Sequence, residues 1–479
     1  LQSGDIETAI DGMQMGDRVA SGANAEFTVD GRRVVVVGAG RSGLAAADLL
    51  AGRGAEVVGT DVRATAMPSP ASSRVSYEFG EHRPETFVSA DLIVLSPGVS
   101  PEQSAVRAAR EAGVPVIGEL ELASRWLRGR VVAVTGTKGK STTSVLVGRL
   151  LDASGFSTLV GGNLGPALSA QVDASTPEVI HVVEASSFQL ELTERFHPWI
   201  AVLLNLSPDH LDRHETVERY ATAKARILAN QEATDWVVVN ADDPQVLAMA
   251  RASQARRLSF ALEAPISDGI TLVDDVITRR TPSSSAPLVP RSAVRVPGRH
   301  LLQDVLAAVA VGVIAGVMPD SMTRAVSTFE GLEHVLEPVC RVGGVQFVND
   351  SKATNLDAAR YAIESFDAGV VPIVGGRFKG GDWRSLRTAL AGRANAVVAI
   401  GESRPQIVEA LGGTVPVHEA DSMATAVRIG FTLAAPHGTV LLAPACASFD
   451  MFHDYAERGR RFKEEVERLA GSVTEVREQ

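Results

Sequence analysis

Cysteine is scarce in this sequence: Cys340 and Cys446 are the only two among 479 residues. They form no metal-binding or disulfide spacing, which indicates a reducing compartment rather than a disulfide-stabilised secreted protein. Long apolar runs are missing as well, because none approaches the roughly 18 residues that a membrane-spanning helix needs. The N-terminus has no basic segment followed by an apolar one, so no signal peptide is evident. We therefore expect a cytoplasmic protein.

Positive charge is also in deficit, since 46 Lys and Arg residues stand against 57 Asp and Glu residues, a net charge of −11. This balance argues against broad binding to nucleic acid or to a membrane surface, and leaves positive charge to act locally in sites. The hydrophobic share of 45% and the charged share of 22% are those of an ordinary globular protein. A length of 479 residues predicts about three domains.

The most informative stretch is 131–143, which reads VVAVTGTKGKSTT. Its β-branched start, 131–135, predicts a buried strand, and apolar residues recur at helical spacing from Ser141 onward. A strand, a glycine-rich loop, Lys-Ser and a helix form the layout of a phosphate cradle, in which Lys140 reaches the terminal phosphates and Ser141 binds Mg²⁺. An ordinary strand-to-helix turn is the alternative, but it gives no reason for Lys-Ser. We predict a nucleoside triphosphate site made by Gly136, Thr137, Lys138, Gly139, Lys140, Ser141 and Thr142.

A second glycine-rich turn, GAGRSG at 38–43, follows an expected strand at 33–37 and precedes a helical pattern. A further strand ends at Asp61, so the stretch matches a dinucleotide-binding fingerprint. The match predicts that a phosphate and a ribose-like diol bind, but it leaves the nucleotide open, and a close packing turn is the alternative. The Ser-Pro-Gly turn at 96–98 follows a strand at 92–95, where open α/β sheets bind ligands.

Alternation of strands and helices predicts an α/β protein with three domains. We expect a Rossmann-like domain at 31–128, a central P-loop ATPase-like domain with a parallel sheet at 129–330, and a Rossmann-like C-terminal domain at 331–479. Residues 1–30 are polar and aperiodic and read as a flexible extension. The segment RRTPSSSAPLVPR, 279–291, reads as a Pro/Ser-rich loop within the central domain.

Two acidic features follow strands of the central domain. Glu184 ends the strand VIHVVE, where a second Mg²⁺ ligand is expected, although a helix-capping acid is a fair alternative. The loop 205–214, NLSPDHLDRH, carries two Asp and two His, including His210. Histidine is an unusual ligand for Mg²⁺, so Mn²⁺ or a supporting role for His210 stays open.

Lys224 lies on an expected helix at 216–230, where its neighbours three and four positions away are mostly apolar. The lysine is therefore expected on the buried face of its helix. Burial lowers the pKa of an amine and makes it nucleophilic or modifiable. A lysine that extends past its neighbours to solvent is the alternative.

Three strands of the last third end in loops rich in Gly, Ser, Thr and Lys, at 349–355, 375–381 and 443–448. Each loop alone is explained by turn chemistry. Together they favour a substrate site that holds carboxylates or phosphates.

These motifs resemble those of the Mur ligase family, over a span from about residue 32 to the end, and within it most closely the members that add D-glutamate. The resemblance rests on GTKGKST at Gly136, EASSFQLE at Glu184, PDHLDRH at Pro208, DSKATN at Asp350, VGGRFKGG at Val374 and PACASFDMFHDYAERG at Pro444. The DSKATN string is the specific one. The resemblance implies an ATP-dependent carboxylate–amine ligase that adds D-glutamate to UDP-N-acetylmuramoyl-L-alanine through an acyl phosphate, in peptidoglycan precursor synthesis.

The resemblance also implies roles for individual residues. The UDP-substrate would be bound, in place of NAD, by Gly40, Arg41, Ser42, Asp61, Arg63, Ser96, Gly98 and Asn163. ATP would also contact Asp350, and the metals would be held by Ser141, Glu184, His210 and Lys224 as a carbamate, the second metal being Mg²⁺ or Mn²⁺. D-glutamate would be held by Lys352, Thr354, Lys379 and Ser448, beside Tyr455. The catalytic set would be Lys140, Lys224, His210 and Glu184, and we expect a monomer that binds neither nucleic acid nor membrane.

The chain departs from the family pattern at five positions. Lys138 replaces an asparagine, Leu301 and Asp304 replace two more, Val335 replaces an arginine, and Arg377 replaces an acid. Three alternatives stay open: a sister ligase that adds another amino acid, an NAD-linked dehydrogenase suggested by the turn at 38–43, and an ATP switch without catalysis.

Overall fold

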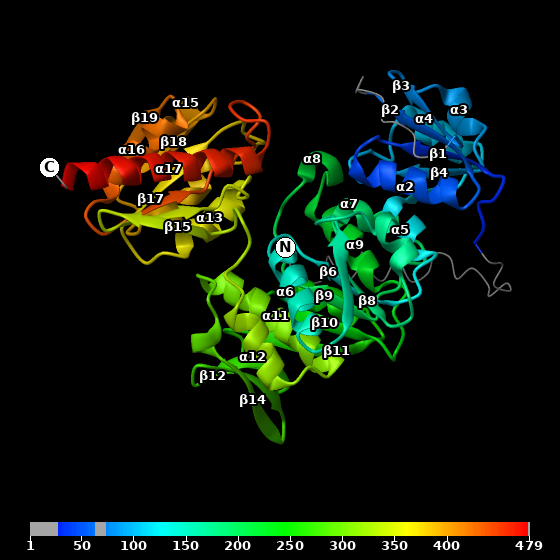
Figure 1. Cartoon of the computed structure of the whole chain (residues 1–479), viewed down its shortest axis with the longest axis horizontal. Coiled ribbons are helices and arrows are strands. Elements are labelled where there is room, and N and C mark those ends of the chain that lie inside the picture. Colours follow the sequence, from blue (N-terminus) through cyan, green and yellow to red (C-terminus); the bar gives the residue numbers. More distant parts are fainter. Residues whose placement is uncertain (1–26, 63–72, 478–479) are drawn as a thin grey trace. The chain divides into compact units, whose positions relative to one another are not determined.

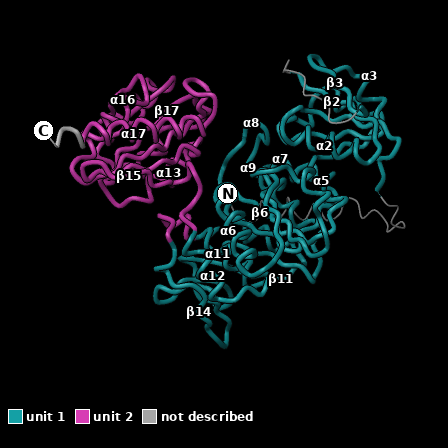
Figure 2. Tube along the Cα trace, viewed as in Figure 1, with its two compact units in different colours: residues 1–294, 303–328 teal, residues 295–302, 329–479 magenta. Residues whose placement is uncertain are grey.

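The computed structural model describes residues 27–62 and 73–477. In these residues the strands form three sheets of five, nine and six strands, with helices packed against them (Figure 1). The prediction of an α/β fold is confirmed. The chain divides into two compact units, residues 1–294 with 303–328 and residues 295–302 with 329–479 (Figure 2). Most of the expected extension, 1–26, lies outside the described residues.

The five-stranded sheet of the first unit is parallel and has the order β3-β2-β1-β4-β5. Its elements are β1 (Arg33–Val37), α2 (Arg41–Gly52), β2 (Glu56–Asp61), β3 (Val75–Phe79), α3 (Pro84–Val88), β4 (Leu92–Leu95), α4 (Ser104–Glu111), β5 (Val116–Gly118) and α5 (Glu119–Ser124). Strands β2 and β3 follow on one side of the central β1–β4 pair, and β5 follows on the other. The loops after β1 and β4 therefore meet at a switch point, where such sheets bind ligands. Strand β3 was not predicted, because Val75 is its one buried residue and it carries no apolar run.

The nine-stranded sheet of the first unit has the order β14-β13-β12-β11-β10-β9-β6-β8-β7. Its strands are β6 (Arg130–Thr135), β7 (Ser157–Gly162), β8 (Val179–Glu184), β9 (Ile200–Leu203), β10 (Trp236–Asn240), β11 (Arg256–Ala261), β12 (Gly269–Val273), β13 (Val276–Thr281) and β14 (Ser284–Pro290). The helices along this stretch are α6 (Lys140–Asp152), η1 (Leu168–Ala174), α7 (Ser187–Leu190), α8 (Leu211–His214), α9 (Val217–Ala225), η2 (Arg226–Leu228), α10 (Pro244–Arg251), η3 (Arg291–Ala293), α11 (Arg299–Ala315) and α12 (Pro319–Ser327). Strand β6 pairs in parallel with β8 and β9, so the loops that follow these three strands lie side by side. Every residue of β8 is buried, as expected for a strand that is covered on both faces.

The prediction of an irregular Pro/Ser-rich loop at 279–291 is wrong. This stretch belongs largely to β13 and β14, which form an antiparallel hairpin that continues the sheet from β12. Strand β14 is the edge of the sheet, and most of its residues are exposed. An edge strand tolerates serine and proline because one side of its backbone needs no partner strand, so its composition resembles that of a loop.

The six-stranded sheet of the second unit has the order β15-β16-β20-β17-β18-β19, and only the β15–β16 pair is antiparallel. Its strands are β15 (Glu337–Val342), β16 (Val345–Asn349), β17 (Val370–Gly375), β18 (Val397–Ile400), β19 (Val417–Ala420) and β20 (Thr439–Leu442). Its helices are α13 (Leu356–Glu364), η4 (Trp383–Leu386), α14 (Arg387–Leu390), α15 (Arg404–Leu411), α16 (Met423–Ala434) and α17 (Tyr455–Arg477). The neighbours β16, β20 and β17 are the three strands whose loops were singled out in the sequence.

Among the described residues, no helix combines the length and the apolar character that crossing a membrane requires.

His181, in β8, gives the central sheet a predicted sensitivity to acid. The side chain is fully buried between Ser175 Oγ, 2.8 Å from Nε2, and Gln171 Oε1, 3.3 Å from Nδ1. Burial lowers the pKa of His181 from 6.5 to about 4. Between these values the unfolded chain takes up a proton that the folded chain does not, so stability falls as the pH falls. At pH 5 the loss is about 2 kcal/mol.

We expect His181→Gln, which keeps hydrogen-bonding groups but does not titrate, to lose less stability between pH 7 and pH 5 than the wild type. Urea unfolding at the two pH values measures the difference. His453→Gln is the control, because the side chain of His453 is 92% exposed. An equal loss in wild type and His181→Gln would contradict the assignment.

Candidate active site

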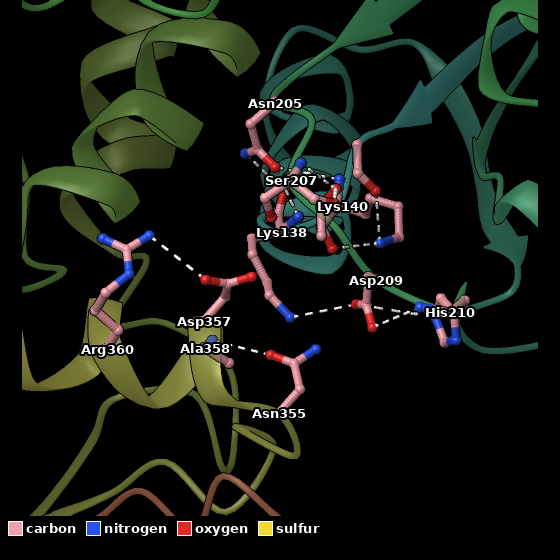
Figure 3. Close-up of polar contacts among 12 residues, drawn as sticks. Lys138, Lys140, Asn205, Ser207, Asp209, His210, Asn355, Asp357, Ala358 and Arg360 are labelled. Atoms are coloured by element: carbon pink, nitrogen blue, oxygen red, sulfur yellow. Dashed lines mark hydrogen bonds and ion pairs between the residues drawn. The ribbon is translucent and has the colours of Figure 1, made fainter. Parts of the chain in front are cut away.

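The glycine-rich loop between β6 and α6 has a backbone shape that only glycine allows at its end. Gly139 has φ +83°, and a Cβ atom there would lie 2.0 Å from Asp304 Oδ1. The side chain of Asn205, from the loop after β9, holds the other end. Its Oδ1 accepts from the backbone N–H groups of Thr137, at 3.1 Å, and Lys138, at 2.8 Å, and its Nδ2 donates to the Lys138 carbonyl at 3.1 Å (Figure 3). The side chain of Asn205 therefore fixes the shape of the phosphate loop between β6 and α6.

Two lysine side chains meet inside this loop. Lys140 Nζ donates to the carbonyls of Gly136 and Thr137, both at 2.9 Å, and Lys224 Nζ donates to the same Gly136 carbonyl at 2.8 Å. Lys224 is 2% exposed and lies over the ring of Tyr220, 4.5 Å from its centroid. The prediction that Lys224 faces the core is confirmed, although α9 ends at Ala225 and the turn that follows is the 3₁₀ helix η2.

The pKa of Lys224 is well below its ordinary value, first because of burial and then because of the nearby Lys140. An amine in this state is neutral over much of the range in which a surface lysine is charged. It can then act as a nucleophile or react with carbon dioxide.

Glu184 ends β8, next to the phosphate loop, and its carboxylate is 2% exposed. Its Oε1 accepts from Asn163 Nδ2 at 2.6 Å, while among the described residues its buried Oε2 has no hydrogen-bond partner. A buried carboxylate oxygen without a donor fits a cation, since leaving it uncompensated is costly. Ser141, the second residue of α6, supplies the hydroxyl that such loops direct at Mg²⁺. These residues fit a magnesium site.

The loop after β9 brings Asp209 and His210 to the same region. Lys138 Nζ lies 3.6 Å from Asp209 Oδ2, and the N–H of His210 donates to Asp209 Oδ1 at 3.0 Å (Figure 3). Burial opposes the ionisation of Asp209, but Lys138 and His210 outweigh it and lower the pKa of Asp209. The ring of His210 packs edge-on against Phe188, with centroids 4.8 Å apart.

Asn205 received no role from the sequence, and the structure gives it one. We expect Asn205→Ala to raise the KM for ATP by roughly 10- to 100-fold, because three hydrogen bonds that shape the loop are lost. Lys138→Asn is the matched control: it changes the side chain in the loop but keeps the backbone groups that Asn205 holds. Initial rates at varied ATP measure both variants. Similar KM values in Asn205→Ala and wild type would show that the loop keeps its shape without the amide.

A pocket of about 560 Å³ opens at the switch point of the first sheet. It is lined by these residues that were predicted to bind the UDP-substrate: Gly40, Arg41, Ser42, Asp61, Ser96, Gly98 and Asn163. Arg63, predicted with them, lies outside the described residues. The pocket is also lined by His82, Gln103 and Gln189. His82 and Gln103 lie outside any recognisable motif, and Gln189 belongs to the EASSFQLE motif but received no role from the sequence.

The loops at the base of this pocket are closely packed and hydrogen-bonded to one another. The N–H of Ala39 donates to Asp61 Oδ2 at 2.9 Å, and Ser96 Oγ donates to the Gly38 carbonyl at 3.0 Å. A Cβ atom at Gly43 would lie 1.7 Å from that same carbonyl oxygen, so glycine is required there.

Asn163 connects the pocket with the cation site. Arg41 Nη2 donates to its carbonyl at 3.2 Å, and its own N–H donates to the Glu184 carbonyl at 2.9 Å. Its side-chain amide also binds Glu184 Oε1, as described above. The pocket and the cation site thus share one residue.

In the second unit, a buried arginine joins the loops after β16 and β20. Arg458, from α17, is 1% exposed and donates to Ser351 Oγ at 3.0 Å, to the Ser351 carbonyl at 2.8 Å and to the Cys446 carbonyl at 3.0 Å. Burial lowers the pKa of Arg458 to about 10. The N–H of Gly375 donates to the Pro444 carbonyl at 2.8 Å, which joins the remaining loop.

The residues predicted for the amino acid lie on these loops or just beyond them. Ser448 is buried, Lys352 and Thr354 are half-buried, and Lys379 is exposed. Tyr455, the first residue of α17, is 40% exposed and lies edge-on to His334, with centroids 6.1 Å apart. Asp350, predicted to contact ATP, is buried, and its Oδ1 accepts from the Leu336 N–H at 3.2 Å.

The departures from the family pattern have different surroundings. Asp304 is buried against Gly139, and burial raises its pKa well above the usual value. Arg377 is exposed and forms an ion pair with Glu402 at 3.2 Å. Leu301 is buried, and Val335 forms an isolated bridge with Leu332.

Family models match all three sheet regions of the chain. The Mur ligase MurD-like N-terminal domain matches residues 32–118, the Mur ligase middle domain matches 134–312, and the Mur ligase glutamate ligase domain matches 336–446.

Curated relatives match along nearly the whole length. The UDP-N-acetylmuramoylalanine--D-glutamate ligase of Acidobacterium capsulatum is 44% identical over 443 residues, 91% of this chain and 96% of that protein. The protein of the same name from Koribacter versatilis is 42% identical over 447 residues, 92% of this chain and 98% of that protein.

Solved structures share the fold. A pseudomurein peptide ligase type C from Methanothermus fervidus has a TM-score of 0.59 at 16% identity, covering 91% of this chain and 100% of its own. The MurF ligase from Thermotoga maritima, in complex with ADP, has a TM-score of 0.58 at 20% identity, covering 93% and 97%. With matching family models over its three sheet regions and relatives above 40% identity, the chain belongs to the Mur ligase family.

Proposed function

We propose that this protein is an ATP-dependent ligase that joins D-glutamate to UDP-N-acetylmuramoyl-L-alanine in peptidoglycan precursor synthesis. Relatives that carry the name of this activity match 91% and 92% of the chain. One structural observation carries the proposal: the side-chain nitrogens of Lys140 and Lys224 both donate to the Gly136 carbonyl of the phosphate loop. A pocket of about 560 Å³, lined in part by Asn163, lies in the same unit of the chain. A dehydrogenase would need the pocket but not the loop.

We assign one substrate to each part of the chain. Residues 31–128 would bind the UDP-substrate, with Asn163 contributed by the next part, residues 129–330 would bind ATP, and residues 331–479 would bind D-glutamate. A pocket of about 560 Å³ lies in the range usual for small-ligand sites.

Lys140 would hold the γ-phosphate through its ammonium group, with Thr137, Lys138 and Thr142 around it. Ser141, Glu184 and Lys224, the last as a carbamate, would hold Mg²⁺, and His210 would stand near a second divalent ion, Mg²⁺ or Mn²⁺. Bound magnesium supplies charge neutralisation at the phosphates. The residues themselves position the groups and stabilise charge, which is most of what phosphoryl transfer needs.

The reaction has two steps. A carboxylate oxygen of the L-alanine attacks the γ-phosphorus of ATP, which forms an acyl phosphate and releases ADP. The amine of D-glutamate then attacks the acyl carbon, loses a proton and expels phosphate. Lys140 would act in the first step, on the transferred phosphoryl group.

The amino acid would be recognised by charge and hydrogen bonds. Lys352 and Lys379 would pair with its carboxylates, and Thr354 and Ser448 would donate hydroxyl hydrogen bonds. Tyr455 would pack beside it, and Asp350 would contact the nucleotide. Arg458 would fix the shape of the loops that carry these groups.

We further propose that the protein acts as a monomer in the cytoplasm.

Phosphate release with UDP-N-acetylmuramoyl-L-alanine and ATP tests the proposal, with D-glutamate, L-glutamate, lysine and alanine compared as the amine. We expect release that depends on D-glutamate. Release that depends on another amino acid instead would show a sister ligase. Release without any amino acid would show an ATPase, and binding of NAD in preference to UDP would favour the dehydrogenase.

A further inference from the structure

The carboxyl group of Asp304 lies against the end of the phosphate loop. Asp304 belongs to α11, falls in the same compact unit as the loop, and is 3% exposed. Its Oδ1 lies 2.0 Å, and its carboxyl carbon 2.8 Å, from the point that a Cβ atom on Gly139 would occupy. Gly139 is the N-cap residue of α6 and offers no side-chain cap. The glycine therefore leaves room for an acid group at the N-terminus of α6, where such loops bind phosphate.

The second carboxyl oxygen of Asp304 is unsatisfied. Oδ2 is buried and has no hydrogen-bond partner among the described residues. Lys140 is the charged side chain that acts on Asp304, but its ammonium group is bonded to the carbonyls of Gly136 and Thr137. A buried polar oxygen in this state is costly, so it favours a ligand that pairs with it.

An acid in these surroundings retains its proton. Burial raises the pKa of Asp304 well above its ordinary value, and Thr143 and Lys140 oppose only part of that rise. A phosphate group at the loop would add negative charge and favour the protonated form further. A protonated carboxyl group has one O–H donor, whereas an ionised one only accepts hydrogen bonds and repels phosphate.

The proton on Asp304 thus decides what this end of the loop offers to a nucleotide. Asparagine, the residue that the family pattern has at this position, would offer an amide N–H donor at every pH. Asp304 offers a donor only while it holds its proton. This chain has therefore replaced a permanent donor by one that depends on pH.

We propose that Asp304 is a nucleotide-binding residue that donates its carboxyl O–H to a phosphate oxygen at the N-terminus of α6. This inference rests on the proposed function, because it concerns the nucleotide that the loop binds. It adds a dependence on pH that asparagine in the same place would not give.

Binding of ADP to the full chain, measured by calorimetry between pH 6 and pH 9.5 without magnesium, tests the proposal. The bound state needs the proton on Asp304, and the free protein loses it as the pH rises. We therefore expect the affinity of the wild type to fall with rising pH, by up to about tenfold per pH unit. Asp304→Asn should bind ADP as tightly as the wild type at pH 6, and at least about tenfold more tightly at pH 9.5. The ratio of the two affinities at each pH cancels the titration of ADP and of the lysines.

Asp320→Asn, on α12, is the matched control, because it removes the same charge at an exposed position of the same unit. It should keep the pH dependence of the wild type. If Asp304→Asn does not fold, as thermal melting would show, Asp304→Ser takes its place, since a hydroxyl group donates without titrating in this range.

The results separate this inference from the proposed function. A wild-type affinity that does not fall across the range, or that falls in parallel with that of Asp304→Asn, would overturn the inference. Phosphate release that depends on D-glutamate would still support the function in either case. A wild type that neither binds ADP nor releases phosphate would overturn both.

Discussion

Replacing Lys140 with alanine is expected to lower turnover by about a thousandfold, the scale of losing one cation that stabilises a phosphoryl group in transfer. Lys140 Nζ lies within the curve of the phosphate loop, bonded to the carbonyls of Gly136 and Thr137 (Figure 3). Lys224 Nζ also donates to the Gly136 carbonyl, but burial lowers its pKa well below the ordinary value. Alanine at position 140 therefore removes the charge that we propose to hold the transferred phosphate.

The affinity for the UDP-substrate should stay within about twofold of the wild type, because Lys140 is not among the residues that line the pocket. Phosphate release and UDP calorimetry on the same preparation measure the two effects. Arg149→Ala is the control on the same helix, since Arg149 is exposed and its guanidinium donates to the Thr328 carbonyl. Wild-type turnover in Lys140→Ala would refute the assignment of the loop.

Replacing Lys224 with methionine is expected to change activity and stability in opposite directions. Turnover should fall at least about a hundredfold, because the group proposed to carry the metal-binding carbamate is lost. Stability should stay the same or rise by about 1 kcal/mol, since a buried polar amine is replaced by an apolar side chain of similar length. Phosphate release and urea unfolding measure the two.

The pH dependence of stability distinguishes this variant further. Because the folded-state pKa of Lys224 is well below 10.5, the unfolded chain binds a proton that the folded chain does not between those values. Wild-type stability therefore gains from this residue as the pH rises through that window, and Lys224→Met should show a flatter curve. A variant that is both less stable and fully active would contradict the proposed role.

The phosphate loop could be predicted from the sequence because its signals are local. A buried strand, glycines and Lys-Ser at a helix start all fall within 131–143, and the structure begins α6 at Lys140, one residue before Ser141. Lys224 could be placed on a buried face for the same reason, since helical spacing alone relates it to its apolar neighbours.

Features that depend on contacts between residues far apart in the sequence could not be predicted. The hairpin of β13 and β14 looks like a loop because an edge strand has no buried row of side chains. Asn205 reads as an ordinary loop residue until the pairing of β6 with β9 brings its amide to the phosphate loop. His82 and Gln103 are 21 residues apart and share no motif.

Local pattern in the sequence thus determined that this is an α/β protein with a phosphate-binding turn and a buried lysine, because strand, turn and helix signals act over a few residues. Tertiary structure alone decided which loops meet. The order of strands in each sheet put β8 and β9 on either side of β6, and β20 between β16 and β17. Those pairings are long-range, and they turn separate polar loops into sites.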